Sequence, residues 1–170
     1  VDAITALGVY DVPVDEWGFD VTVCGAQKAL MLPPGLAIVT VSDKGWKASE
    51  RSNLPRFYAD LGRERKSQDK GETAFTPAVS LIVGLRESLR MMKEETLEGV
   101  WNRHERLAKA TRAAGGGLGL GLLSSSPANG VTGFLMPPGI DGGAVIKQMR
   151  TRYGITIAGG QDHLKGKIIR

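Results

Sequence analysis

The chain has 170 residues, 42% of them hydrophobic, which is enough to bury the core of one domain or of two small ones. Its net charge of +4 comes from cations scattered among carboxylates, without the aromatic-interleaved basic stripe of nucleic-acid-binding proteins, so we expect no nucleic-acid partner. No apolar run approaches the roughly 20 residues that span a bilayer, so we expect no membrane partner, and the single cysteine agrees with the expected cytoplasmic location.

The first 41 residues carry short apolar runs separated by turn signals. The β-branched run from Val21 to Val23 predicts a buried strand that ends at Gly25. Lys28 then lies just past the strand end, on a turn that Pro33-Pro34-Gly35 closes. Turns at strand ends often carry functional side chains, which makes this lysine the first candidate for a site.

Lys28 is unusual because apolar residues surround it in the sequence. Burying an unpaired ammonium is costly, and a lysine so placed can act as an amine nucleophile that forms a Schiff base. The competing interpretation is a lysine that packs its stem on apolar neighbours and extends its ammonium into solvent. Position alone favours this second interpretation.

The middle of the chain changes from polar to helical. Residues 42–76 are polar and irregular, which predicts a long loop. Thr76-Pro77 predicts the start of a helix. Its apolar positions follow a helical spacing: Leu81, Leu85, Leu89 and Met92. A second helix is expected from Leu97 to the glycines at 115–117.

The last third of the chain predicts alternating strands and a helix. A strand is expected over 131–136, followed by a helix that Asp141 caps and Gly154 ends, and then by strands over 155–158 and 167–170. The two histidines, His104 and His163, have no metal-ligand spacing, so we expect no metal site.

Several segments agree with one known pattern. They are Asp2-Ala3-Ile4, Leu7-Gly8, Trp17-Gly18, Gly25-Ala26-Gln27-Lys28-Ala29-Leu30 and Pro33-Pro34-Gly35-Leu36-Ala37. Together they resemble the fold-type I, class V pyridoxal-phosphate aminotransferases, and within them the serine–glyoxylate and alanine–glyoxylate branch. Residues 159–163 also resemble segments of microbial members with other amino donors.

The resemblance implies an α/β fold in which residues 19–24 and 36–41 border a parallel sheet. Residues 1–95 would form the C-terminal part of the large PLP-binding αβα domain, and residues 96–170 would form most of the small α+β C-terminal domain. It also implies that the chain is a fragment of a longer enzyme, lacking the N-terminal portion and the extreme C-terminus. The glycine-rich turn that holds the cofactor phosphate would lie in the missing portion.

The resemblance further implies pyridoxal 5'-phosphate as cofactor and gives roles to four residues near the lysine. Lys28 would form the Schiff base and act as the catalytic residue, and Asp2 would pair with the pyridine nitrogen. Ile4 would pack under the ring and Gln27 would bind on the phosphate side. Plain structural roles compete: a solvated carboxylate, a core strand residue and a turn side chain. Ala26 departs from the serine that the family usually carries.

Two more positions follow from the resemblance. Thr76 would reach the cofactor phosphate of a neighbouring subunit, which implies a homodimer with shared active sites, although a plain helix cap is the competing role. Thr73 stands where some relatives have a phosphate-binding tyrosine. Arg170 would bind the substrate carboxylate through both guanidinium nitrogens, and its competing role is a frayed, solvated chain end.

Three functions remain open at this point. The first is a transaminase that moves an amino group between serine or alanine and glyoxylate or a similar 2-oxo acid. The second is a class V lyase of the cysteine desulfurase kind, which Gln27 before the lysine and the single thiol of Cys24 disfavour. The third is a non-catalytic fragment that serves only as a dimerisation module.

Overall fold

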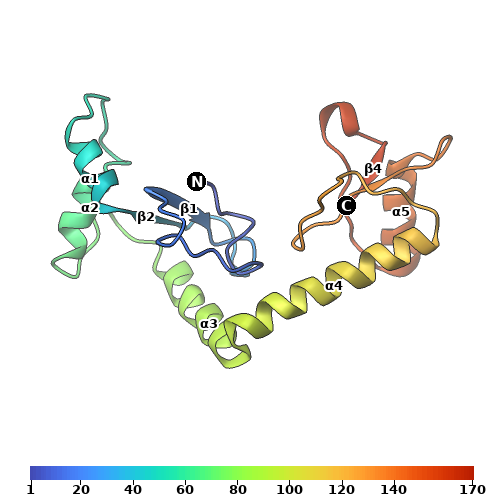
Figure 1. The fold of residues 1–170 in the computed structure, drawn as a ribbon, viewed down its shortest axis with the longest axis horizontal. Helices are drawn as coiled ribbons and strands as arrows, with labels where there is room; N and C mark the ends of the chain where they lie inside the picture. The colour runs from blue at the N-terminus through green and yellow to red at the C-terminus, as the bar shows by residue number, and fades with distance from the viewer. The chain divides into compact units, whose positions relative to one another are not determined.

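The structure is a computed structural model that describes residues 1–170, and the chain divides into two compact units, Val1–Thr96 and Leu97–Arg170 (Figure 1). The first unit contains β1 (Val21–Gly25), β2 (Ala37–Val41), α1 (Asp43–Glu50), α2 (Leu61–Gln68) and α3 (Val79–Glu95). The second contains α4 (Leu97–Gly117), β3 (Phe134–Leu135), α5 (Gly142–Tyr153), the 3-10 helix η1 (Asp162–Leu164) and β4 (Ile168–Ile169).

The expected α/β class is confirmed, whereas the assignment of residues 1–95 and 96–170 to the large and small domains stays a prediction. None of the helices combines the length and apolar character that a bilayer crossing requires.

The sheet of the first unit corrects the expected parallel pairing. β1 and β2 are antiparallel, in a register that runs from Val21 opposite Val41 to Gly25 opposite Ala37. Residues 26–36 contain no helix, and parallel strands need a longer crossover connection. The other edge of β1 is parallel in part, because Asp2 forms a parallel bridge with Val23. The Ala3 amide donates to the Val23 carbonyl at 2.8 Å.

The core of the first unit gathers around β1 and the turn that follows it. Its buried apolar residues are Ala3, Val9, Cys24, Ala26, Leu30, Leu32 and Met92. Gly8 permits this packing, since its φ is +83° and an added Cβ would lie 2.8 Å from the Cβ of Ala29. The turn that carries Lys28 is therefore packed from both sides.

The predicted loop over 42–76 is wrong in part, because it contains α1 and α2. Ser42 caps α1 by accepting from the Gly45 amide at 3.1 Å, and Asp60 caps α2 by accepting from the Gly62 amide at 2.9 Å. Neither helix buries a residue. The sequence pattern missed them because a helix without a buried face shows no apolar periodicity.

The predicted start of α3 is also wrong. The helix begins at Val79 with Ala78 at the N-cap position, and no side chain caps it. Thr76 therefore does not serve as the helix cap that Thr76-Pro77 indicated. The second helix extends from Leu97 to Gly117 as expected, and α3 ends before it at Glu95, followed by Thr96 with a φ of +71°.

In the second unit, the helix prediction is confirmed and the strand predictions are too long. Asp141 caps α5 by accepting from the Ala144 amide at 3.0 Å, and Gly154 ends it with φ +67°. The strand expected over 131–136 shortens to β3, which pairs antiparallel with β4. The segment 155–158 is not a strand, although Gly159 forms a bridge with Ile169. Short pairing suffices here because hydrogen bonds from loop backbone complete the sheet edge.

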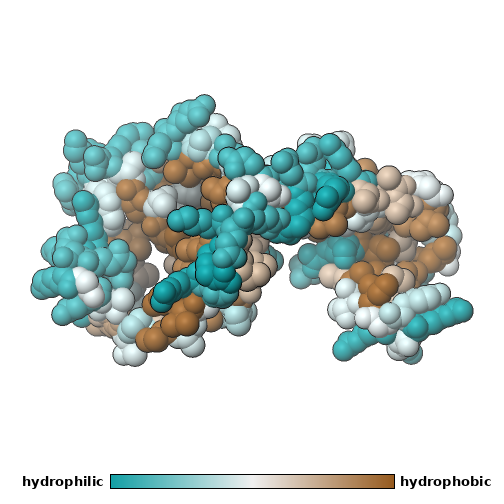
Figure 2. Space-filling model, turned by 90° about the horizontal axis from the view of Figure 1, so that it is seen from below, coloured by the Kyte–Doolittle hydropathy of each residue, from teal (hydrophilic) through white to brown (hydrophobic).

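Apolar side chains remain at the surface of the chain, visible as brown areas among the hydrophilic ones (Figure 2). The first unit exposes Leu54, Phe57, Tyr58, Val79, Ile82 and Val83. Contiguous exposed apolar surface commonly marks a contact with another protein segment or chain. Leu89, predicted as an inward position of the helix, is 50% exposed.

Candidate active site

Lys28 lies on a tight turn that directly follows β1. The Ala26 amide donates to the Leu36 carbonyl at 3.0 Å, the Leu32 amide donates to the Ala26 carbonyl at 3.1 Å, and Ala26 is fully buried. The Met31 amide donates to the Lys28 carbonyl at 2.9 Å. The lysine itself is exposed. This agrees with the interpretation that position alone favoured, a lysine that extends its ammonium into solvent: the turn is fixed and its amine is accessible.

Asp2 lies beside the same strand, on the edge opposite β2. Its carboxylate accepts from the Ile4 amide at 2.8 Å, and its backbone bridges Val23. Burial raises the pKa of the Cys24 thiol, and the nearby negative charge of Asp2 raises it further. The bridge places Asp2 beside the middle residue of β1, two residues before the strand ends. The fold thus brings Asp2 beside the strand that leads to the Lys28 turn.

Ile4 and Gln27 flank this end of the strand. Ile4 is half-buried and Gln27 is exposed. A Cβ added at Gly25 would lie 2.6 Å from Oε1 of Gln27. Because glycine has no side chain, the side-chain amide of Gln27 can occupy this space. A glutamine side chain in that place offers both a hydrogen-bond donor and an acceptor beside the lysine.

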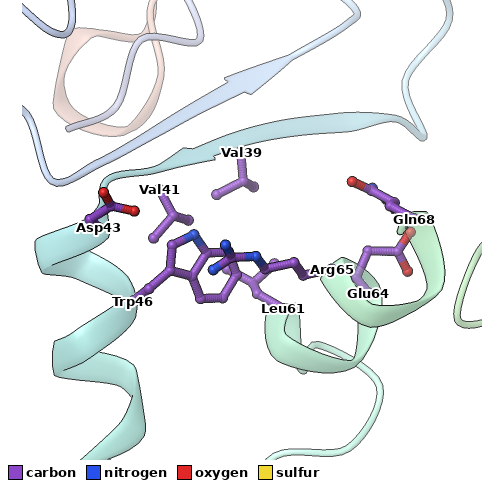
Figure 3. Close-up of a pocket in the computed structure, with 8 residues that line it drawn as sticks. All are labelled: Val39, Val41, Asp43, Trp46, Leu61, Glu64, Arg65 and Gln68. Atoms are coloured by element: carbon purple, nitrogen blue, oxygen red, sulfur yellow. Dashed lines mark hydrogen bonds between the residues drawn. The ribbon is translucent and has the colours of Figure 1, made fainter. Parts of the chain in front are cut away.

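Thr76 is exposed and lines a hollow of about 390 Å³, together with Leu36, Tyr58 and Phe75. A neighbouring hollow of about 320 Å³ shares Val39, Leu61, Glu64 and Gln68 with it. Figure 3 shows this second hollow between β2 and helices α1 and α2, with the Arg65 guanidinium over the Trp46 ring at 4.7 Å from its centroid. Of the predicted site residues, only Thr76 lines either hollow.

Arg170 belongs to the second unit. Its backbone amide donates to the Ala158 carbonyl at 2.8 Å and its carbonyl accepts from the Ala158 amide at 3.0 Å. Its Nε donates to the Gly159 carbonyl at 2.8 Å, while the side chain stays exposed. The backbone of Arg170 is therefore paired rather than frayed, while its side chain is exposed to solvent as the competing role has it, and its role in substrate binding stays a prediction.

Two residues that shape these positions were not predicted. Ser88 is buried in α3 and its hydroxyl donates to the Leu30 carbonyl at 2.6 Å, which ties the Lys28 turn to the helix. A lone serine at an inward helical position was the available signal. Gly159, which holds Arg170, carried no signal of its own because a backbone carbonyl is common to all residues.

The family model described as aminotransferase class-V matches residues 1–164. The chain belongs to this family. The predicted membership of the class V aminotransferases is therefore confirmed, and with it the expected cofactor, pyridoxal phosphate. The roles of the individual site residues in this class-V aminotransferase chain stay predictions.

Individual relatives match this chain over its whole length, but the chain spans less than half of the length of each relative. A protein from Synechococcus sp. named soluble hydrogenase, small subunit, is 48% identical over all of this chain and 44% of that protein. The serine–glyoxylate aminotransferase of Methylorubrum extorquens is 37% identical over all of this chain and 44% of that protein. The crystal structure of alanine–glyoxylate aminotransferase from Nostoc sp. superposes with a TM-score of 0.92 at 28% identity, covering 99% of this chain and 46% of that one.

The residues of this class-V aminotransferase chain fit pyridoxal phosphate. An accessible amine on a fixed turn, a carboxylate beside the strand that leads to this turn and the Gln27 amide next to the lysine supply an imine-forming group, a partner for a pyridinium nitrogen and a hydrogen-bond donor and acceptor. Lys28, Asp2 and Gln27 are the residues of the first unit that would hold the cofactor there.

Proposed function

We propose that the protein to which this chain belongs is a pyridoxal-phosphate-dependent aminotransferase that exchanges an amino group between serine or alanine and glyoxylate or a similar 2-oxo acid. The observation that carries the proposal is the accessible Lys28 on the turn directly after β1, the strand that Asp2 bridges at Val23. Names of relatives support the substrate class, since they include serine–glyoxylate and alanine–glyoxylate aminotransferases.

In this proposal each residue has a distinct task. Lys28 binds the cofactor through its amine and, once the substrate has displaced it, moves the proton from the substrate Cα. Asp2 keeps the pyridine nitrogen protonated, and the cofactor supplies an electron sink for the resulting carbanion. Arg170 binds the carboxylate that both amino-acid and 2-oxo-acid substrates share.

We also propose a homodimer with active sites at the subunit interface. Thr76 is exposed and forms no cap on α3, so its hydroxyl is available to a partner's cofactor phosphate. The exposed apolar surface of the first unit supports an interface of this kind. The cytoplasmic location likewise stays a prediction.

The lyase alternative is less well supported. A desulfurase needs an accessible cysteine thiolate, whereas the one thiol within these 170 residues, Cys24, is buried, and its raised pKa disfavours the thiolate. The third alternative, a non-catalytic dimerisation module, makes no use of the accessible amine of Lys28. We therefore retain transamination as the proposal.

The test uses the full-length protein loaded with pyridoxal phosphate. Borohydride reduction followed by peptide mapping is expected to label Lys28, and Lys28→Ala is expected to abolish both transamination and the reducible absorbance band. Lys47→Ala, an exposed lysine on α1, is the matched control and should change neither. Labelling of another lysine, or full activity of Lys28→Ala, would contradict the proposal.

A further inference from the structure

The orientation of the Arg170 guanidinium depends on one backbone carbonyl. Nε donates to the Gly159 carbonyl at 2.8 Å, and the two terminal nitrogens have no hydrogen-bond partner within residues 1–170. In the bidentate mode, these two nitrogens donate to the two oxygens of a carboxylate. The direction of the Gly159 carbonyl therefore sets the plane in which Arg170 offers them.

That carbonyl is fixed by a tight turn over residues 159–164. A Cβ added at Gly160 would lie 2.2 Å from the Leu164 carbonyl oxygen and 2.6 Å from its carbon. Both atoms are backbone, so no side-chain rotation relieves the clash. The Leu164 amide donates to the Gln161 carbonyl at 2.9 Å, and Asp162 adopts φ +47°, which shows how closely the turn is wound.

The neighbouring glycine is under a weaker constraint. A Cβ at Gly159 would meet only Cδ1 of Ile146, at 3.0 Å, on the far end of a flexible side chain of α5. The requirement for glycine is thus strongest at position 160, whose amide nitrogen is bonded to the Gly159 carbonyl carbon. A change in the turn at Gly160 therefore moves the Gly159 carbonyl with it.

We propose that Gly160 is a positioning residue for substrate binding: by letting the turn close against Leu164, it aims the Gly159 carbonyl that orients Arg170 toward the carboxylate of the amino-acid and 2-oxo-acid substrates. The inference rests on the proposed function, because it takes Arg170 as the carboxylate-binding residue.

The test uses the full-length enzyme with its cofactor. Gly160→Ala is expected to raise KM for both substrates about tenfold or more, because the substrate carboxylate loses the geometry of one charge-assisted hydrogen bond. The value of kcat and the cofactor absorbance should change little. Calorimetry with propionate, a non-reactive monocarboxylate, should show the same loss of affinity. Gly117→Ala is the matched control, because a Cβ there meets nothing within 4 Å.

Two further variants separate the possible outcomes. In an Arg170→Ala background, Gly160→Ala is expected to have no additional effect on propionate binding, since the group it positions is gone. Should Gly160→Ala fail to fold, Gly159→Ala shifts the same carbonyl with a milder clash and should weaken propionate binding only when Arg170 is present.

The inference is overturned if propionate binds equally well to the glycine variants, or if the loss is as large without Arg170. If Arg170→Ala itself leaves propionate binding and KM unchanged, the assignment of Arg170 in the proposed function fails instead.

Discussion

The Ser88 hydroxyl donates to the Leu30 carbonyl at 2.6 Å across 58 positions of the chain, and both residues are buried. The contact joins α3 to the turn that presents Lys28. The lysine is exposed, so its place depends on the backbone beneath it, and Ser88 is one of the groups that fix this backbone.

Ser88→Ala is expected to lower the free energy of unfolding by about 1–3 kcal/mol, because it leaves the buried Leu30 carbonyl without its donor. Urea unfolding of the full-length protein measures the difference. Ser80→Ala, an exposed serine in the same helix, should change stability by no more than about 0.5 kcal/mol. Equal effects of the two substitutions would rule out a structural role for the hydrogen bond.

Subunit complementation tests the shared active site. A mixture of Lys28→Ala and Thr76→Ala chains should regain activity above the mean of the parents, because one site of each heterodimer carries both residues intact. Random assortment limits the recovery to about a quarter of the wild-type sites. Mixing Lys28→Ala with the double variant restores no such site and serves as the control. Activity no higher than the parents would argue against a contribution of Thr76 across the interface.

The 170-residue chain as a separate polypeptide is expected to bind the cofactor weakly and to show little or no turnover. β2 pairs only with β1, so its outer edge is open to aggregation. The relatives also carry more than half of their length outside the matched region, and each phosphate hydrogen bond absent from the chain costs about 1.5–3 kcal/mol. Titration with pyridoxal phosphate, followed by an assay with serine or alanine and glyoxylate, measures both properties. Stoichiometric tight binding with steady turnover would refute this prediction.

The ion pair that anchors the start of α1 predicts a pH effect. Lys44 Nζ donates to the Asp20 carboxylate at 2.8 Å, and this hydrogen bond, with a second one from Ser42, lowers the pKa of Asp20 below its ordinary value of 3.8. Because the folded-state pKa is the lower one, the stabilisation is present above the unfolded value and is lost as pH falls through the folded value.

Asp20→Asn should therefore lower the melting temperature slightly near neutral pH, and the difference from wild type should shrink as pH falls from about 6 to about 2. Asp15→Asn, an exposed carboxylate without an ion pair, is the control. A difference that stays constant over this range would show that the charge of Asp20 does not contribute.

The sequence by itself determined the family, the strand that ends at Gly25 with Lys28 beyond it, and the limits of α5 between Asp141 and Gly154. These features follow from local rules, because a β-branched run, a capping carboxylate and a left-handed glycine act within a few residues of themselves. The helices α1 and α2 escaped prediction because they bury no apolar face.

Only the tertiary structure decided that β2 returns antiparallel to β1, that Ser88 holds the Lys28 turn, and that Gly159 holds Arg170. Each of these facts depends on contacts between residues far apart in the chain. A hydroxyl at position 88 or a carbonyl at position 159 has no distinctive pattern in the sequence, and it gains its role only when folding brings a partner within hydrogen-bond distance.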